Sequence, residues 1–235
     1  MGKQLDCQHN SQNKIFSMLS SSKNPFGLPF VFLPSSRSGE GKVLIGVPNH
    51  PNWLIFSRNL MSNNDFPRVI TYVNIRLALF WFSLCKDLLN YRDIFLVLFF
   101  NNNDIFYMMN IYSDPSQSAL KYLKNTKANF QNLLIMTGDF KIRDNLWNPL
   151  YPHYSSHSDD LFIIADSFNL GLSIPTNWVP TRYSDNCQEV NLVLNLMFLH
   201  FGSDELDNYI IHPDWRLTSD HTPLMIVISI IKEHI

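Results

Sequence analysis

Cysteine is scarce in this sequence of 235 residues: there are three, Cys7, Cys85 and Cys187. Their number is odd, they stand far apart, and none belongs to a Cys-x-x-Cys pair. Small secreted proteins that depend on disulfides carry even sets of closely spaced cysteines, and structural zinc sites use paired ones. The sequence therefore favours neither a disulfide framework nor a zinc site, and a reducing compartment is expected.

An excess of charge of one sign is also lacking. Eighteen Lys and Arg residues against 20 Asp and Glu residues give a formal net charge of −2. This balance produces no overall attraction to nucleic acid, although it is compatible with a local basic face. Charge by itself therefore predicts no partner.

Long hydrophobic runs are absent as well. The most apolar window, RLALFWFSLCKDLL, is interrupted by Lys86 and Asp87, whereas a membrane-spanning helix needs about 20 apolar residues. The segment MGKQLDCQHNSQNK has no apolar core of a signal peptide, and Asp6 stands where a myristoylation signal needs Ser or Thr. We expect a soluble intracellular protein, cytoplasmic or nuclear, with no membrane and no protein partner.

What the sequence does have is a series of short apolar runs rich in Val, Ile and Phe, each bounded by turn-forming residues. Such runs predict buried strands. Strands are expected at 30–33, 43–47, 53–57, 68–74, 93–100, 104–112, 132–140, 191–199, 208–212 and 223–230, and helices at 13–21, 114–131 and 159–170. Many strands with few helices predict an α/β sandwich of two sheets flanked by helices, in one domain over residues 1–235. Residues 1–40 are more polar and less regular than the rest.

The helix at 114–131 carries the clearest local signals. Asp114 is a suitable N-cap, and Pro115 follows at the favoured first helical position. Ala119, Leu120, Leu123 and Phe130 then fall on one stripe at helical spacing. This helix is expected to link two strands and to bury that stripe.

Polar groups that suit a functional site stand at the ends of four apolar runs. They lie in NIYSD (110–114), in TGDFK (137–141), at Asn195 inside NLVLNLMFL, and in TSDHTPL (218–224). Layered α/β proteins usually build their sites where strands end. The last segment places a carboxylate, Asp220, and an imidazole, His221, on consecutive residues before a buried strand.

The order of these motifs resembles the endonuclease/exonuclease/phosphatase family. More narrowly, IYSD, GDFK, SDDL, PTR, the strand NLMFL and SDH follow one another as they do in the endonuclease domain that precedes reverse transcriptase in non-LTR retrotransposons, particularly fungal ones. The resemblance covers residues from about 45 to 230 and rests on several ordered motifs rather than on one. It implies a four-layered α/β sandwich with two mixed β-sheets flanked by helices.

The resemblance also implies a chemistry and a set of roles. Members hydrolyse DNA phosphodiesters with a divalent ion, usually Mg²⁺ or Mn²⁺, which offsets charge on the phosphoryl oxygens while water attacks in line. Asp139 matches the aspartate that orients this water, Asp220 the one near the metal, and His221 the imidazole that contacts the scissile phosphate. Asn110 and Tyr112 match the Asn-x-Tyr pair that reaches the phosphate, and Arg182 belongs to the Thr-Arg motif.

Two of the motifs are altered. The phosphate-binding asparagine after GDF is Lys141, which still neutralises phosphate charge, but as a flexible point charge. The strand aspartate that would orient and polarise His221 is Asn195, and a neutral amide cannot stabilise an imidazolium. From the residues alone, Lys141 is equally compatible with a solvated surface lysine, and Asn195 with a hydrogen-bonded core amide.

The beginning of the chain departs further from the family pattern. Members open with a strand that ends in Leu-Asn and a second strand that ends in Gln-Glu-Pro, whose glutamate is the principal metal ligand. Here Asp6 falls at the asparagine position, and Pro34 and Ser35 stand where the Gln-Glu pair is expected. Glu40, between two glycines, replaces this ligand only if its loop folds back.

These departures predict a DNA phosphodiester hydrolase with very weak activity or none. Two alternatives stay open: a non-catalytic module that binds nucleic acid through Lys141, Arg143 and Arg182, and a transposon-derived product without a function. Salt-sensitive DNA affinity without cleavage would distinguish the binding module from the enzyme.

Overall fold

The computed structural model describes residues 30–34, 51–57, 69–74, 81–84, 93–101, 104–126, 130, 132–148, 151–173, 179–183, 191–200, 210–211 and 224–225. Its main feature is a six-stranded sheet in the order β4-β5-β6-β7-β9-β8. The pairing of β6 with β7 is parallel, and the other neighbours are antiparallel. The strands span Trp81–Leu84 (β4), Ile94–Asn101 (β5), Asp104–Tyr112 (β6), Leu133–Asp139 (β7), Leu170–Leu172 (β8) and Asn195–His200 (β9).

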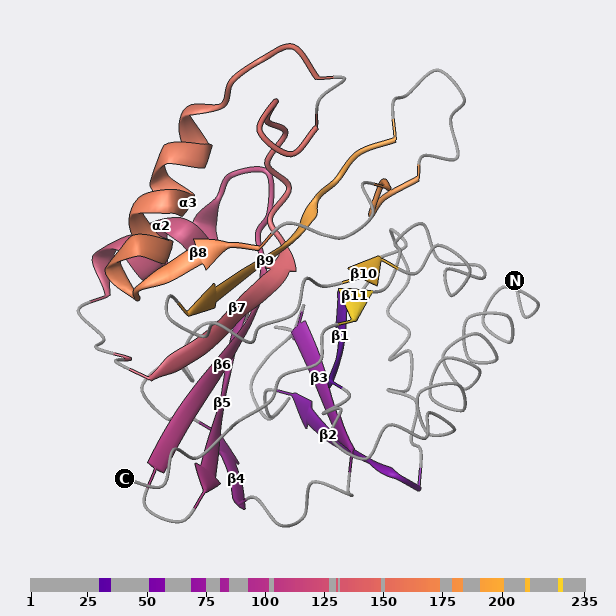
Figure 1. Ribbon diagram of the computed structural model, residues 1–235, viewed down its shortest axis with the longest axis vertical. Coiled ribbons are helices and arrows are strands. Elements are labelled where there is room, and N and C mark those ends of the chain that lie inside the picture. Colours follow the sequence, from indigo (N-terminus) through magenta and orange to yellow (C-terminus); the bar gives the residue numbers. More distant parts are fainter. Residues whose placement is uncertain are drawn as a thin grey trace, which may run out of the picture.

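Two helices cover one face of this sheet (Figure 1). Helix α2 spans Ser118–Asn125 and α3 spans Ser156–Ser167. Side chains alternate across a strand, so every second residue of the central strands faces the helices. The resulting core joins Met109, Ile111, Met136, Leu196 and Phe198 of the sheet to Ala119, Leu120, Leu123, Leu161, Ile164 and Ala165 of the helices.

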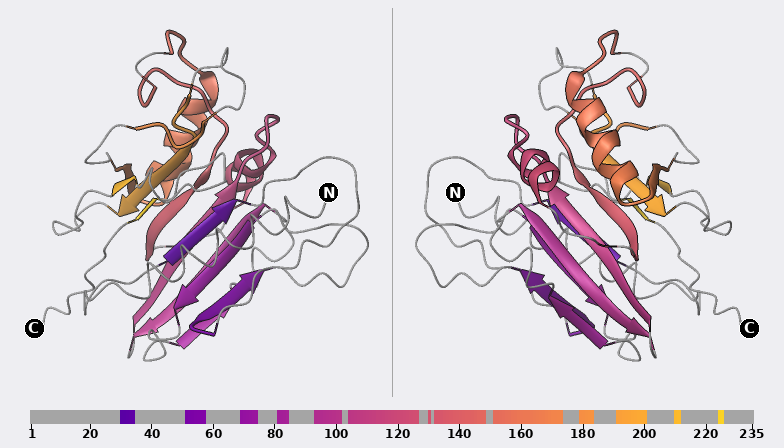
Figure 2. Two further views of the ribbon diagram at one scale, coloured as in Figure 1. Left: turned by 90° about the vertical axis from the view of Figure 1, so that its right-hand side faces the viewer. Right: turned by 90° about the vertical axis from the view of Figure 1, so that its left-hand side faces the viewer.

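A second, three-stranded sheet packs on the opposite face (Figures 1 and 2). Its order is β1-β3-β2, with β1 at Phe30–Pro34, β2 at Trp53–Ser57 and β3 at Val69–Asn74, and both pairings are antiparallel. Strand β3 contacts β5 and β6, and β1 contacts β7. A hydrogen bond of 3.2 Å from the Asn110 amide to the Thr71 hydroxyl joins the two sheets. A short pair, β10 (Ile210–Ile211) and β11 (Leu224–Met225), is also antiparallel.

The predicted α/β class is confirmed, and most predicted strands are found within a few residues of their expected bounds. Strands β4 and β8 were not predicted, because the first lies in the most apolar window and the second was assigned to the end of a helix. The third helix was predicted at 159–170, but α3 begins earlier, at Ser156. Ser155 caps it, because the Ser155 side chain accepts a hydrogen bond from the His157 amide. The strand expected at 43–47 and the helix at 13–21 lie outside the described residues.

The prediction that Asp114 and Pro115 start α2 was wrong by one turn. Gln117 precedes the helix in the left-handed conformation, with φ 56°. The Asp114 carboxylate still accepts hydrogen bonds from the Ser118 amide at 3.1 Å and the Ser118 hydroxyl at 3.0 Å. A turn through Pro115 and Ser116 thus separates the capping carboxylate from the helix that it caps. The described helices include none that is long and apolar enough to cross a membrane.

Gly138 permits the parallel contact between β6 and β7. Its φ is 150°, and a Cβ at this position would lie 1.8 Å from the Ile111 carbonyl oxygen. A side chain here would collide with backbone, which cannot move aside as a flexible side chain does. The glycine of the GDF motif is therefore required by the pairing of the two strands.

We predict that Gly138→Ala lowers the free energy of unfolding by about 4 kcal/mol or more, because the methyl group separates β6 from β7. Urea denaturation followed by circular dichroism measures this loss. Lys124→Gln is the matched control: Lys124 is exposed on α2 in an ion pair with Asp160, and its replacement changes stability by less than about 1 kcal/mol. Equal stability of Gly138→Ala and the unaltered protein would contradict this account.

Candidate functional site

Three of the predicted site residues stand in a row across neighbouring strands. Tyr112 at the end of β6 pairs in register with Asp139 at the end of β7, and Asp139 pairs with Asn195 at the start of β9. Alternation places all three on the face opposite the helices, since Ile111 and Leu196 face the helical core. The strand order thus gathers residues that are far apart in the sequence at one end of the sheet.

Asp139 lies at the centre of this row, and its side chain is fully buried. The Lys141 ammonium Nζ is 2.6 Å from Asp139 Oδ2, and the Lys141 backbone N–H donates to Oδ1 at 3.3 Å. The same Nζ lies 5.7 Å from the centre of the Tyr112 ring, within the range of a cation–π interaction. Lys141 therefore neutralises the carboxylate that the motif would use to orient water, and the alternative of a purely solvated lysine is wrong.

The backbone at Lys141 has a conformation that is unusual for lysine. Its φ is 53°, in the left-handed region, where asparagine is tolerated better than other side chains. A lysine in this conformation costs about 1 kcal/mol. The turn after Asp139 thus has a conformation that suits asparagine better than lysine.

Asn195 is 7% exposed, and its Oδ1 has no hydrogen-bond partner among the residues that the structure describes. The carbonyl oxygen of the amide is therefore not satisfied by the described residues, and both interpretations of Asn195, as a site residue and as a core amide, stay predictions. Its backbone is held firmly, because the Thr181 hydroxyl accepts from the N–H groups of Leu194 at 2.8 Å and Asn195 at 2.9 Å. The backbone of Asn195 is thus held in place beside Asp139.

Asn110 and Arg182 occupy different surroundings. Asn110 is 4% exposed, and its amide donates to Thr71 of the second sheet, so it holds the two layers together. Arg182 is half-buried and forms a backbone bridge with Leu192, just before β9. The bridge brings Arg182 to the end of the sheet where Asp139 lies. The substrate-binding roles of both residues stay predictions.

The remaining predicted site residues, His221 and Asp220, lie outside the described part of the chain, as do Asp6, Ser35 and Glu40. Strand β1 ends at Pro34. The resemblance predicts the Gln-Glu pair at Pro34 and Ser35, and this correspondence stays a prediction.

A divalent ion does not fit the described residues. They include no cluster of three or more His, Cys, Asp or Glu side chains able to hold a metal. Asp139 is the carboxylate of the GDF motif, and its Oδ2 lies 2.6 Å from the Lys141 ammonium Nζ. At this end of the sheet the described residues thus provide Asp139, whose charge the Lys141 ammonium already offsets.

Several residues that support the site were not predicted. The Ser113 hydroxyl donates to the Gln117 side chain at 2.7 Å, and the Gln117 amide donates to the Phe140 carbonyl at 3.2 Å. These bonds tie the start of α2 to the GDF turn. Thr181 could have been found from the Thr-Arg motif. Ser113 lies in the IYSD motif, but nothing in the sequence indicated its bond to Gln117, which has no distinguishing pattern.

Asp144 is the most connected of the residues that sequence reasoning missed. It is fully buried and accepts hydrogen bonds from the backbone N–H of Leu146 at 2.9 Å, the backbone N–H of Ser155 at 2.8 Å and the Ser158 hydroxyl at 2.5 Å. Burial alone would raise the pKa of Asp144, but these hydrogen bonds outweigh it and hold the pKa below its ordinary value of 3.8. The carboxylate joins the segment after the GDF motif to the start of α3.

Comparisons with solved structures show the class of fold. The chain has the α/β fold of the endonuclease/exonuclease/phosphatase proteins, as the resemblance predicted. It matches the endonuclease domain of TRAS1, a telomere-specific non-LTR retrotransposon, with a TM-score of 0.63 and 16% identity over 78% of this chain and 83% of that one.

Two further structures are similar. The AP endonuclease LMAP from Leishmania major matches with a TM-score of 0.57 and 10% identity, over 78% of this chain and 72% of that one. TDP2 from D. rerio, humanized by 14 mutations, matches with a TM-score of 0.54 and 11% identity, over 96% of this chain and 93% of that one. No protein-family model matches the sequence, and neither does any curated protein. At these identities the likeness establishes the fold.

The lowered pKa of Asp144 gives a prediction about stability and pH. The ionised carboxylate stabilises the folded protein above its ordinary pKa, and this contribution is lost as the pH falls from 3.8 through the lower folded-state value. Asp144→Asn should therefore cost about 2 kcal/mol at neutral pH, and less as the pH falls below about 4.

Urea denaturation of both proteins over a pH series measures this difference. Asp166→Asn is the control, because Asp166 is exposed near the end of α3. A stability difference for Asp144→Asn that stays constant from neutral to acidic pH would contradict the assigned role of the ionised carboxylate.

Proposed function

We propose that this chain is a DNA phosphodiester hydrolase of the metal-dependent endonuclease type, with very weak cleavage or none. The observation that carries this proposal is the row of Tyr112, Asp139 and Asn195 at one end of the sheet, with the Lys141 ammonium 2.6 Å from the Asp139 carboxylate. The row supports an ancestral phosphodiester site. The lysine supports the loss of its activity.

The arrangement suits an anionic backbone. Lys141 is 22% exposed, so its ammonium reaches the surface while it contacts Asp139. A phosphate oxygen is attracted to such a cation, and the phenol of Tyr112 lies beside it as a hydrogen-bond donor. Arg182, at the same end of the sheet, adds a planar donor that matches phosphate geometry. These residues would position a DNA phosphate above the row.

Cleavage needs more than a bound phosphate. A carboxylate orients an attacking water by accepting its proton in a hydrogen bond, and the ion pair with Lys141 competes for the same oxygen of Asp139. In addition, the resemblance pairs His221 with Asn195, which would offer a neutral amide where the family offers an aspartate, and such a change in a His-Asp pair costs about 10⁴ in rate. Both effects act against hydrolysis and leave phosphate binding intact.

The proposal includes finer features of the family. The two helices, the six-stranded sheet and the three-stranded sheet would be three layers of a four-layered sandwich. Mg²⁺ or Mn²⁺ would be the ion of the ancestral reaction, held by Asp220 with a substitute for the missing glutamate. DNA would be the partner. Within this proposal the protein acts inside the cell, in the cytoplasm or nucleus.

A second candidate function is DNA binding without cleavage. The ion pair between Lys141 and Asp139 favours it, because a resident ammonium attracts phosphate without a divalent ion. DNA affinity that falls with salt and is unchanged by EDTA, together with no cleavage, would support this candidate over the enzyme.

Nicking of supercoiled plasmid DNA with Mg²⁺ or Mn²⁺ tests the proposed function. We expect no measurable cleavage from the unaltered protein and a gain of cleavage in the double variant Lys141→Asn with Asn195→Asp. Adding His221→Ala to this double variant should abolish the gain. Cleavage by the unaltered protein that disappears in His221→Ala would show a working site and overturn the expected inactivity.

A further inference from the structure

A hollow of about 400 Å³ opens beside the GDF turn, outside the row of strand-end residues. Its lining includes Gln117, Lys141, Arg143, Tyr151 and His157. Lys141 thus belongs both to the row, through Asp139, and to the wall of the hollow. Any ligand that fills the hollow lies next to the ammonium that faces the proposed phosphate site.

The wall of the hollow is rigidly built. The Asp144 carboxylate fastens the segment after Arg143 to the start of α3. The buried Trp147 donates from its indole N–H to the Ile142 carbonyl at 3.2 Å. Asn148 exchanges two hydrogen bonds with the backbone of Val193, at 2.6 and 3.1 Å. Side chains on such a scaffold present a preformed surface to a ligand.

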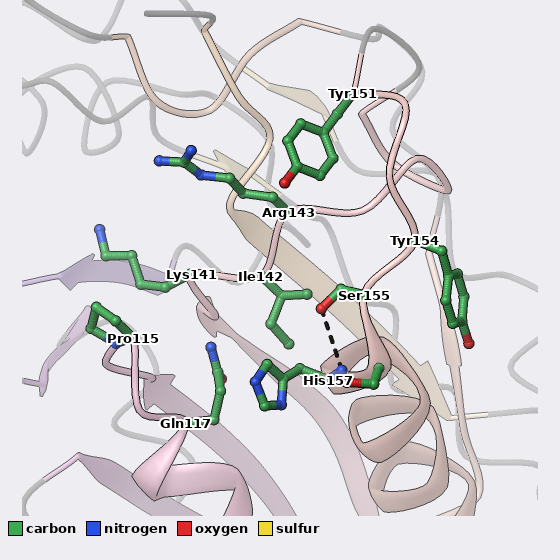
Figure 3. A pocket seen from close by; sticks show the side chains of 10 residues that line it. Pro115, Gln117, Lys141, Ile142, Arg143, Tyr151, Tyr154, Ser155 and His157 are labelled. Carbon is green, nitrogen blue, oxygen red and sulfur yellow. Dashed lines mark hydrogen bonds between the residues drawn. The ribbon is translucent and has the colours of Figure 1, made fainter.

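The charges around the hollow favour an anion. Arg143 is exposed and makes no ion pair with any described residue. Asp144, its neighbour in the sequence, is buried among its own hydrogen bonds. Figure 3 shows Lys141 and Arg143 extending to the same side of the hollow. The Lys141 charge is offset by Asp139, so the charge of Arg143 is the one that attracts a phosphate to the hollow.

Uncharged groups complete the surface. In Figure 3 the Tyr151 hydroxyl points toward Arg143, while Gln117 and His157 lie together at the foot of the hollow. Backbone amides at the start of α3 are already in use, since the N–H of His157 donates to Ser155 Oγ and that of Ser158 to the Ser155 carbonyl. The binding groups are therefore side chains. The Tyr151 ring, which lines the hollow, packs edge-on against His153, a residue that precedes the helix.

We propose that this hollow binds the nucleotide next to the one at Lys141 in the same DNA strand. Arg143 would pair with its phosphate through parallel N–H donors, and Tyr151 would contact the sugar or base with its ring and the phosphate with its hydroxyl. Lys141 then lies between two successive phosphates. This inference rests on the proposed function, because it assumes that a DNA phosphate lies above Asp139.

Fluorescence anisotropy of a labelled DNA duplex over a series of salt concentrations tests this subsite. Arg143→Gln should weaken binding about tenfold or more, because it removes the paired, charge-assisted hydrogen bonds to the phosphate. It should also lower the slope of log affinity against log salt by about 1, the contribution of one phosphate contact. Lys124→Gln, which removes a cation on α2 away from the hollow, should change neither quantity.

The outcomes separate the two proposals. If Lys141→Gln weakens binding and Arg143→Gln matches the unaltered protein in affinity and slope, the proposed phosphate site stands and the subsite is wrong. If the unaltered protein does not bind DNA, the proposed function fails and the subsite fails with it. Competition by inorganic phosphate as strong as competition by a dinucleotide would also overturn the subsite, because a nucleotide makes contacts that free phosphate lacks. A thermal transition of Arg143→Gln equal to that of the unaltered protein shows that folding is unaffected.

Discussion

The close parallel contact of β6 with β7 is the constraint on which the site depends. Gly138 permits it, because the Ile111 carbonyl occupies the space where a side chain would begin. The contact fixes the register that sets Tyr112 beside Asp139, and the antiparallel partner β9 then brings Asn195 to the other side. Hydrogen bonds from Ser113 and Gln117 extend this order into the turn that carries Lys141. A backbone requirement at one residue thus positions side chains from three separate segments.

The altered residues change the electrostatics of this row while the geometry is kept. Asp139 is buried where an isolated carboxylate would be costly, and the Lys141 ammonium offsets its charge at 2.6 Å. The lysine takes a left-handed conformation that suits asparagine better, so it sits in a turn shaped for another side chain. Asn195 leaves its carbonyl oxygen without a partner among the described residues. Together these features support the proposed phosphodiester site, in which binding groups would persist while the catalytic ones are compromised.

Much of the fold could be predicted from the sequence, because buried strands leave a local signal. The runs at 53–57 and 104–112 were predicted with the bounds that the structure shows. Ala119, Leu120 and Leu123 of the predicted apolar stripe are buried in α2, but the helix ends at Asn125 rather than 131, so the buried Phe130 lies beyond it. Strand β8 could not be predicted, since three residues directly after a helix carry no alternation. The start of α2 was misplaced because Asp114 caps the helix across a turn, and the left-handed Gln117 gives no sequence signal.

Part of the site could be predicted from the order of its motifs rather than from hydrophobic patterns. Ordered motifs indicated Asp139, Tyr112 and Asn195, and the strand register places them together. The ion pair of Lys141 with Asp139 could not be predicted, because a lysine two residues away can equally point to solvent. Asp144 was missed, since its role depends on a helix that begins eleven residues later and turns Ser155 and Ser158 toward it.

The central claim is that the Lys141 ammonium, rather than a divalent ion, neutralises Asp139. A high-resolution crystal structure of the unaltered protein grown with MnCl₂ tests it most directly, because Mn²⁺ is located by its anomalous scattering. We expect Lys141 Nζ in direct contact with Asp139 Oδ2 and no Mn²⁺ bound to that carboxylate. Anomalous density on Asp139, with the Lys141 side chain turned to solvent, would contradict the account and show that the site still accepts a metal.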